Sequence, residues 1–133
     1  MQLMRARMDN LTALFKALSD RNRLRIVTAL MEYEELCACQ IIEFMQVTGA
    51  TVSRHMGVLI ASGLVDSRKE GRWVYYRLRR EAVEFAGLVQ WIEKQLTSDS
   101  AVARDAKTLA EILSCDPEEI SRKQRSDAWC ANT

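Results

Sequence analysis

The sequence predicts a mainly α-helical fold that contains one small β-hairpin. Five stretches between residues 11 and 96 place apolar residues at the spacing of an amphipathic helix. Between residues 64 and 78 the period changes, and aromatic and β-branched residues lie on both sides of a glycine turn, which is typical of a β-hairpin. The 133 residues, of which 48% are hydrophobic, suffice for one core of ordinary size.

The first two helices are predicted over residues 11–18 and 24–31, where apolar side chains recur along one side of each helix. Ser19 and Asp20 stand between these stretches. Their polar side chains end the first helix and can cap the second.

A tightly connected helix pair follows. The third helix is expected from about Cys37 to residue 45, and a tight connection spans residues 46–49. Thr48 is suited to cap a fourth helix over residues 50–62, and Gly63 ends it.

The hairpin turns at Gly71, and a fifth helix over residues 85–96 follows it. In order, these elements (α-α-α-α-β-β-α) describe a winged helix-turn-helix domain over residues 1–96. Residues 97–133 form a C-terminal extension. It is expected to be partly helical over 99–113, with one more short helix started by Asp116 and Pro117.

Positive charge is concentrated in the helix pair and the hairpin. Residues 48–80 hold seven basic and two acidic residues, a net of +5, whereas residues 97–133 carry −2. A basic face of this kind is either a solvated surface or the footprint of a nucleic acid.

The fourth helix is the candidate recognition helix, because its polar face carries side chains suited to base edges and phosphates. Lys69 and Arg72 on the hairpin could reach the DNA backbone or a minor groove. Each residue also has a structural explanation without DNA: His55 could be an ordinary surface histidine, Thr51 a helix-start residue and Arg72 a solvated turn charge. The candidate DNA-binding residues are Thr51, Ser53, Arg54, His55, Lys69 and Arg72.

The chain begins without the apolar segment of a secretion signal and has no run long enough to span a membrane. We therefore expect a cytoplasmic protein that does not contact a membrane and whose cysteines stay reduced, as ligands, sensors or buried small residues. Cys37 and Cys39 would point about 200° apart on a regular helix. They could share one ion only if the first helical turn bent, and such bending would misplace the recognition helix.

Four motifs in order resemble the ArsR/SmtB family of metal-sensing repressors. They are residues 17–26 (ALSDRNRLRI), 35–41 (ELCACQI), 51–56 (TVSRHM) and 70–78 (EGRWVYYRL), and the resemblance extends over about residues 9–96. Two positions depart from the family pattern. Gly49 replaces a common glutamine at the start of the recognition helix, and Ile42 stands where a third cysteine is often found.

The resemblance implies a repressor that binds double-stranded operator DNA as a homodimer and needs no cofactor. Its inducer would be arsenite or antimonite, soft ions held by the thiolates of Cys37 and Cys39. Cys115 and Cys130 are the candidates for a third sulfur. The family's histidine-containing zinc site on the fifth helix is excluded, because residues 79–96 contain no histidine.

The residues leave two alternative functions to compare with this one. A regulator of the same fold could respond to thiol oxidation or to another soft metal ion. An enzyme such as a thiol-dependent arsenate reductase is disfavoured, because no cysteine is followed by arginine at the Cys-x5-Arg spacing.

Overall fold

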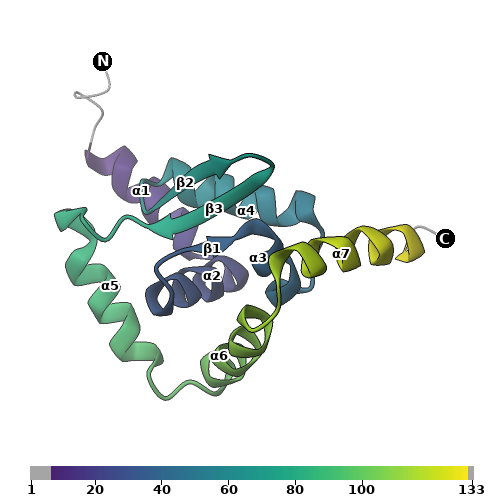
Figure 1. Ribbon diagram of the computed structural model, residues 1–133. Helices are drawn as coiled ribbons and strands as arrows, with labels where there is room; N and C mark the ends of the chain where they lie inside the picture. The colour runs from purple at the N-terminus through teal and green to yellow at the C-terminus, as the bar shows by residue number, and fades with distance from the viewer. Residues whose placement is uncertain (1–6, 132–133) are drawn as a thin grey trace.

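The computed structural model describes residues 7–131, with side chains described as far as residue 125. Seven helices and three strands follow one another in this part of the chain (Figure 1). In chain order they are α1 (Arg7–Leu18), α2 (Arg21–Glu32), β1 (Leu36–Cys37), α3 (Ala38–Met45), α4 (Gly49–Ala61), β2 (Val65–Glu70), β3 (Trp73–Leu78), α5 (Val83–Leu96), α6 (Ser100–Leu113) and α7 (Pro117–Ala131).

Local signals end and begin these helices where the sequence predicts. The Asp20 carboxylate accepts a hydrogen bond from the Arg23 backbone N–H at 3.0 Å and caps α2. The Thr48 hydroxyl accepts one from the Thr51 N–H at 3.1 Å and caps α4. Gly63, at φ 85°, ends α4 in the left-handed conformation that glycine adopts without a Cβ clash.

The sheet contains one strand that the sequence analysis did not predict. The expected hairpin pairs β2 with β3 in antiparallel register, from Val65 opposite Leu78 to Glu70 opposite Trp73. The short strand β1 adds to the other edge of β3, so the strand order is β1-β3-β2. The wing is therefore attached by backbone pairing to the segment that precedes α3.

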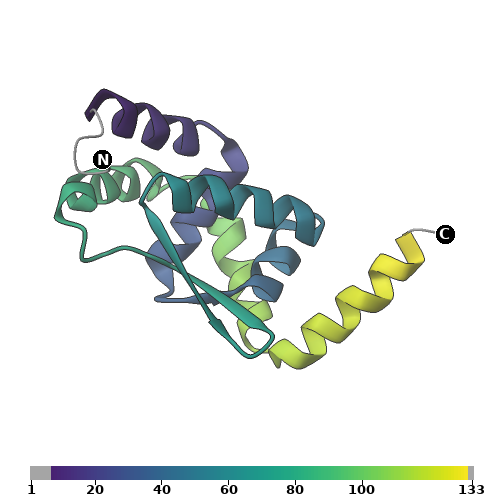
Figure 2. The same ribbon diagram turned by 90° about the horizontal axis from the view of Figure 1, so that it is seen from above.

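The core lies between the sheet and helices α2, α3 and α4. Figures 1 and 2 show the hairpin beside α4. Helices α2 and α3 pack against strand β3, and α4 packs against β2. Ile26, Leu36, Ile41 and Leu59 are fully buried there. No helix in the described part of the chain combines the length and apolar character needed to cross a membrane.

The C-terminal extension packs onto this same core. Leu109 and Ile112 of α6 and Ile120 of α7 are buried in the cluster that residues 7–96 form. The Asp105 carboxylate accepts two hydrogen bonds from the Arg25 guanidinium, at 2.8 and 3.0 Å, and so fixes α6 against α2. The last helix, expected to be short, runs from Pro117 to Ala131.

Truncating Leu109 tests whether the extension stabilises the domain. The side chain is 2% exposed, so we expect Leu109→Ala to lower the free energy of unfolding by about 2–5 kcal/mol, as large-to-small core changes do. Urea unfolding measures this change, and Lys107→Ala on the exposed side of α6 is the matched control. Equal stability of the two variants would contradict a core role for α6.

Candidate functional site

Cys37 and Cys39 lie at the junction between β1 and α3, and their thiols are in contact. Cys37 is the N-cap of α3, with extended dihedrals of φ −71° and ψ 148°, whereas Cys39 is inside the helix. Their Sγ atoms are 3.1 Å apart and both side chains are buried. The expectation that the third helix includes Cys37 and holds the sulfurs apart is therefore wrong. An extended residue in front of a helix does not follow the helical rotation of about 100° per residue.

Two sets of hydrogen bonds keep Cys37 outside the helix. Cys37 pairs with Tyr75 of β3 in the antiparallel register. Its backbone N–H also donates to the Gln40 side-chain oxygen at 2.8 Å, which is one half of a capping box. The thiol pair is thus attached to the wing on one side and to the first helix of the helix-turn-helix pair on the other.

The contact between the two thiols gives them opposite acidities. The Cys39 thiol donates to the Cys37 sulfur, and backbone N–H groups at the start of α3 also face it, which together lower the pKa of Cys37 to about 6. The same hydrogen bond, together with burial, raises the pKa of Cys39. The lowered pKa of Cys37 favours its thiolate, which is the form that binds soft ions.

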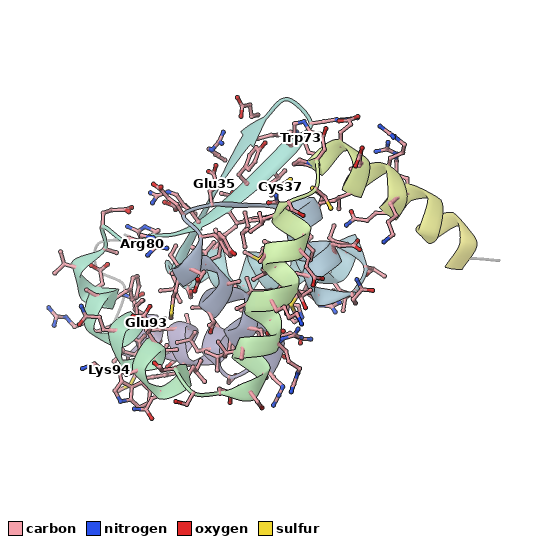
Figure 3. All side chains as sticks on the ribbon, turned by 60° about the horizontal axis from the view of Figure 1, so that its bottom comes forward. Glu35, Cys37, Trp73, Arg80, Glu93 and Lys94 are labelled. Atoms are coloured by element: carbon pink, nitrogen blue, oxygen red, sulfur yellow. The ribbon has the colours of Figure 1, made fainter. Side chains whose placement is uncertain are left out.

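Helix α7 covers the thiol pair. The Cys39 sulfur is 3.9 Å from the Pro117 carbonyl oxygen, and the Gln124 amide donates to the Cys39 carbonyl at 2.7 Å. Figure 3 shows Cys37 and Trp73 at the end of the molecule where α7 begins. The first turns of α7 therefore form one wall of the site.

Of the two tail cysteines, only Cys115 has a described side chain, and it forms no hydrogen bond with the pair. Cys115 is exposed, and its sulfur contacts the Glu111 carbonyl oxygen at 3.7 Å. The Cys130 side chain lies outside the described residues. Within those residues, no group of three His, Cys, Asp or Glu side chains converges on a point where an ion could bind. The described residues thus supply two sulfur ligands.

Helix α4 exposes part of the predicted recognition face. Ser53 and Arg54 are exposed, and Thr51 is half-buried with its hydroxyl 2.9 Å from that of Thr48. This face can present a hydroxyl and a guanidinium to a duplex.

The prediction that His55 belongs to this exposed face is wrong. His55 is 8% exposed, and its Nδ1 lies 3.2 Å from the Arg23 guanidinium. Arg23 also donates to the carbonyls of Lys16 and Ala17 at the end of α1, at 3.1 and 2.8 Å. His55 therefore helps to hold α4 against α1 and α2. The signal was in the sequence, because His55 stands three residues after Val52, on the apolar stripe.

Arg68 of the wing is held by Glu35, a carboxylate that the sequence motifs did not mark as functional. Arg68 donates two hydrogen bonds to Glu35, at 2.6 and 2.7 Å, and stacks over the Tyr75 ring at 4.3 Å. This guanidinium lowers the pKa of Glu35. Lys69 is exposed and stays available for a phosphate contact.

Arg72 lies at the wing tip as predicted, but it has a partner. Its guanidinium is hydrogen-bonded to the Glu118 carboxylate of α7 and lies 4.6 Å from the centre of the Trp73 ring. The contact with Glu118 joins residues 46 apart in the chain, so no short sequence window could reveal it.

Comparisons with known proteins agree on one family. The family model described as bacterial regulatory protein, arsR family, matches residues 20–67, which confirms the resemblance found in the motifs. Over 103 residues the chain is 31% identical to the arsenic resistance transcriptional regulator ArsR1 of Pseudomonas putida, covering 74% of this chain and 76% of that regulator.

A second relative has a different metal in its name. The chain is 44% identical over 70 residues to the cadmium resistance transcriptional regulatory protein CadC of Listeria innocua. The match covers 53% of this chain and 59% of that protein, so the chain spans less than two thirds of the length of this relative.

A solved structure supports the predicted fold class. The transcriptional repressor BigR from Xylella fastidiosa superposes with a TM-score of 0.56 at 28% sequence identity, covering 72% of this chain and 92% of that one. The fold is a winged helix, as the sequence predicts. All three of these proteins are transcription regulators, and none is an enzyme.

The acidity of Cys37 can be measured directly. In a Cys115→Ser, Cys130→Ser background, we expect the ultraviolet absorbance of thiolate to rise as pH increases through about 6. Cys39→Ala removes the thiol donor, so the midpoint should move to higher pH. The denatured protein, whose cysteines titrate near the ordinary value of about 8.5, is the control. Identical midpoints in the two folded proteins would contradict the contact.

Proposed function

Because the chain belongs to the ArsR family of bacterial regulatory proteins, we propose that it is a transcriptional repressor that binds operator DNA and releases it when arsenite or antimonite binds Cys37 and Cys39. The observation that carries this proposal is the buried contact between the two sulfurs, with the pKa of Cys37 lowered to about 6. The lowered pKa favours the thiolate of Cys37, which is the form that binds a soft ion.

The donor set suits a soft, sulfur-seeking ion. Two thiols and no nearby imidazole among the described residues favour arsenic, antimony or cadmium over cobalt and nickel. Zinc in a structural site takes four protein ligands. The described residues bring together only two sulfurs, so the site does not suit structural zinc. Cys115, two residues before Pro117, is the proposed third ligand for a pyramidal ion, with Cys130 as the alternative.

Release would follow from a small separation of the two sulfurs. Two thiolates that bind one ion repel each other and have no S–H···S hydrogen bond between them, so we expect them to stand farther apart than the 3.1 Å of the free pair. One sulfur is attached to β1 and the wing, and the other to α3. Separating the sulfurs would therefore shift the wing relative to the helix pair. The wing and the helix pair must fit the same duplex, so this shift would weaken DNA binding.

DNA contact is assigned to the exposed residues of α4 and the wing. Ser53, Arg54 and Lys69 are exposed, and Thr51 lies at the N-terminal end of α4. Arg72 would join them by exchanging its Glu118 partner for a phosphate. His55 has no place in this set because it is buried.

We propose that the repressor acts as a homodimer formed through α1 and α5. Leu11 and Phe15 of α1 and Trp91 of α5 are 49, 60 and 59% exposed, and within α5 only Ile92 is buried. Residues from both helices line a hollow of about 580 Å³. Large apolar side chains exposed together on two helices favour association with a second copy.

Sedimentation at micromolar concentration tests the dimer. The wild-type chain should sediment as a dimer, and Trp91→Glu should shift it toward the monomer because a charge would be buried in the interface. Glu93→Lys, which points about 200° away from Trp91 on the same helix, should leave the dimer intact. A wild-type monomer that binds DNA one copy at a time would contradict the proposal.

One titration separates DNA binding from sensing. The probe is a duplex that the wild-type protein selects from a random-sequence pool, and fluorescence anisotropy follows its release by arsenite, antimonite, cadmium, zinc and peroxide. Cys37→Ser and Cys39→Ser should bind the duplex like wild type but keep it when arsenite is added, because a hydroxyl is a poor ligand for a soft ion. Arg54→Ala should bind arsenite normally and DNA about tenfold more weakly.

Other results would redirect the proposal. A Cys37→Ser protein that releases DNA at the wild-type arsenite concentration contradicts the thiol mechanism. Release by cadmium alone would make the chain a sensor of that ion, as the name of its Listeria relative suggests. Release by peroxide alone would make it a sensor of thiol oxidation.

A further inference from the structure

Helix α7 has two faces, and only one is needed to hold it in place. The docked face carries Ile120, which is buried, and Gln124, which donates to the Cys39 carbonyl. Lys123, next to Gln124, forms an ion pair with Glu43 of α3 at 3.3 Å. These contacts fix the position and rotation of α7 on α3.

The opposite face carries two exposed arginines in line with the wing tip. Glu118, Arg122 and Arg125 follow the spacing i, i+4, i+7 and therefore lie on one side of the helix. Arg122 and Arg125 are exposed, and we call these two residues the α7 stripe. Within the described residues, neither forms an ion pair within 4.0 Å. The Arg72 guanidinium lowers the pKa of Glu118, and the two arginines of the stripe contribute to this shift.

The contact between Glu118 and Arg72 sets where the stripe begins. Arg72 is in the turn of the hairpin, so the contact places the first turn of α7 at the wing tip. From there α7 runs away from the body of the protein (Figures 1 and 2). With a rise of about 1.5 Å per residue, Arg122 and Arg125 follow Glu118 at about 6 and 10 Å along the helix.

We propose that the α7 stripe extends the DNA-binding surface of this protein, by contacting phosphates of the duplex beyond those that the wing reaches. The inference rests on the proposed function, because it takes the wing to lie on DNA. Its partner is the backbone of double-stranded DNA next to the sequence that α4 reads. Because the proposed contacts are to phosphates and not to base edges, the stripe contributes to affinity and not to sequence choice.

The charge pattern favours this partner. Arg72 of the wing contacts Glu118, and Arg122 follows about one helical turn later, so basic residues from two separate elements meet at the wing tip. Duplex DNA carries one negative charge per about 1.7 Å of its axis, and an elongated row of arginines can follow such a polyanion. Two carboxylates lie along this row: Glu118, and Glu70, which pairs with Arg68 on the wing. When a phosphate replaces Glu118 as the partner of Arg72, the Glu118 carboxylate remains beside the stripe, and the two arginines of the stripe still exceed its single negative charge.

The salt dependence of binding tests the stripe. Arg122→Gln with Arg125→Gln removes both charges, and the probe is a long duplex selected by the wild-type chain from a random pool. Each lost phosphate contact should reduce the slope of log affinity against log salt concentration by about 0.9, so we expect a reduction of about 1.8 per chain. Arg122→Lys with Arg125→Lys should keep most of the wild-type slope, because the charges remain.

A matched pair on α6 controls for net charge. Arg104→Gln with Lys107→Gln removes two exposed charges from the same extension, on α6, which Figure 1 shows below α2 and α3 with the wing above them. This control should bind DNA with the wild-type slope. A stripe variant with the wild-type slope, or a control that changes as much as the stripe variant, overturns the inference and leaves the proposed function intact. A wild-type chain that selects no duplex overturns both.

Discussion

The pairing of β1 with β3 is the constraint on which the rest of the structure depends. Two residues, Leu36 and Cys37, add to the edge of the wing, and this pairing keeps Cys37 extended while the next residue begins α3. The change from strand to helix between two cysteines brings their sulfurs to 3.1 Å. A continuous helix through the same residues would have pointed the thiols about 200° apart. The thiol pair is therefore formed by the secondary-structure boundary itself.

This boundary also makes the site mechanically sensitive. A helix-turn-helix pair and a wing contact DNA together only in one relative orientation, and here they meet at two sulfurs. The Glu35–Arg68 pair lies on the same junction and holds the wing from the outside. Under the proposed function, moving one sulfur away from the other would change the relation between the helix pair and the wing, because a packed core does not absorb such shifts freely. The ion would therefore bind two sulfurs that are already in contact.

The C-terminal extension connects the thiol pair with the wing tip. Helix α6 completes the core through Leu109 and the Arg25–Asp105 pair, which holds the start of α7 near Cys39. The Pro117 carbonyl contacts Cys39, and the next residue, Glu118, is hydrogen-bonded to Arg72. The first turn of α7 thus touches both the candidate sensor and the candidate DNA contact. A change at the thiols has two short routes to the wing, one through β1 and one through α7.

The sequence by itself determined the helices, their caps, the hairpin and the choice of two cysteines as a candidate site, because each of these signals depends on neighbours within a few residues. Asp20, Thr48 and Gly63 act on their own helix ends, and Cys37 and Cys39 are adjacent but one. Tertiary structure decided the rest. It buried His55 against Arg23, paired Cys37 with Tyr75 and joined Arg72 to Glu118. These contacts link residues 32 to 46 positions apart, counted between the paired residues, and they form only when the core has brought their elements together, so local spacing holds no record of them.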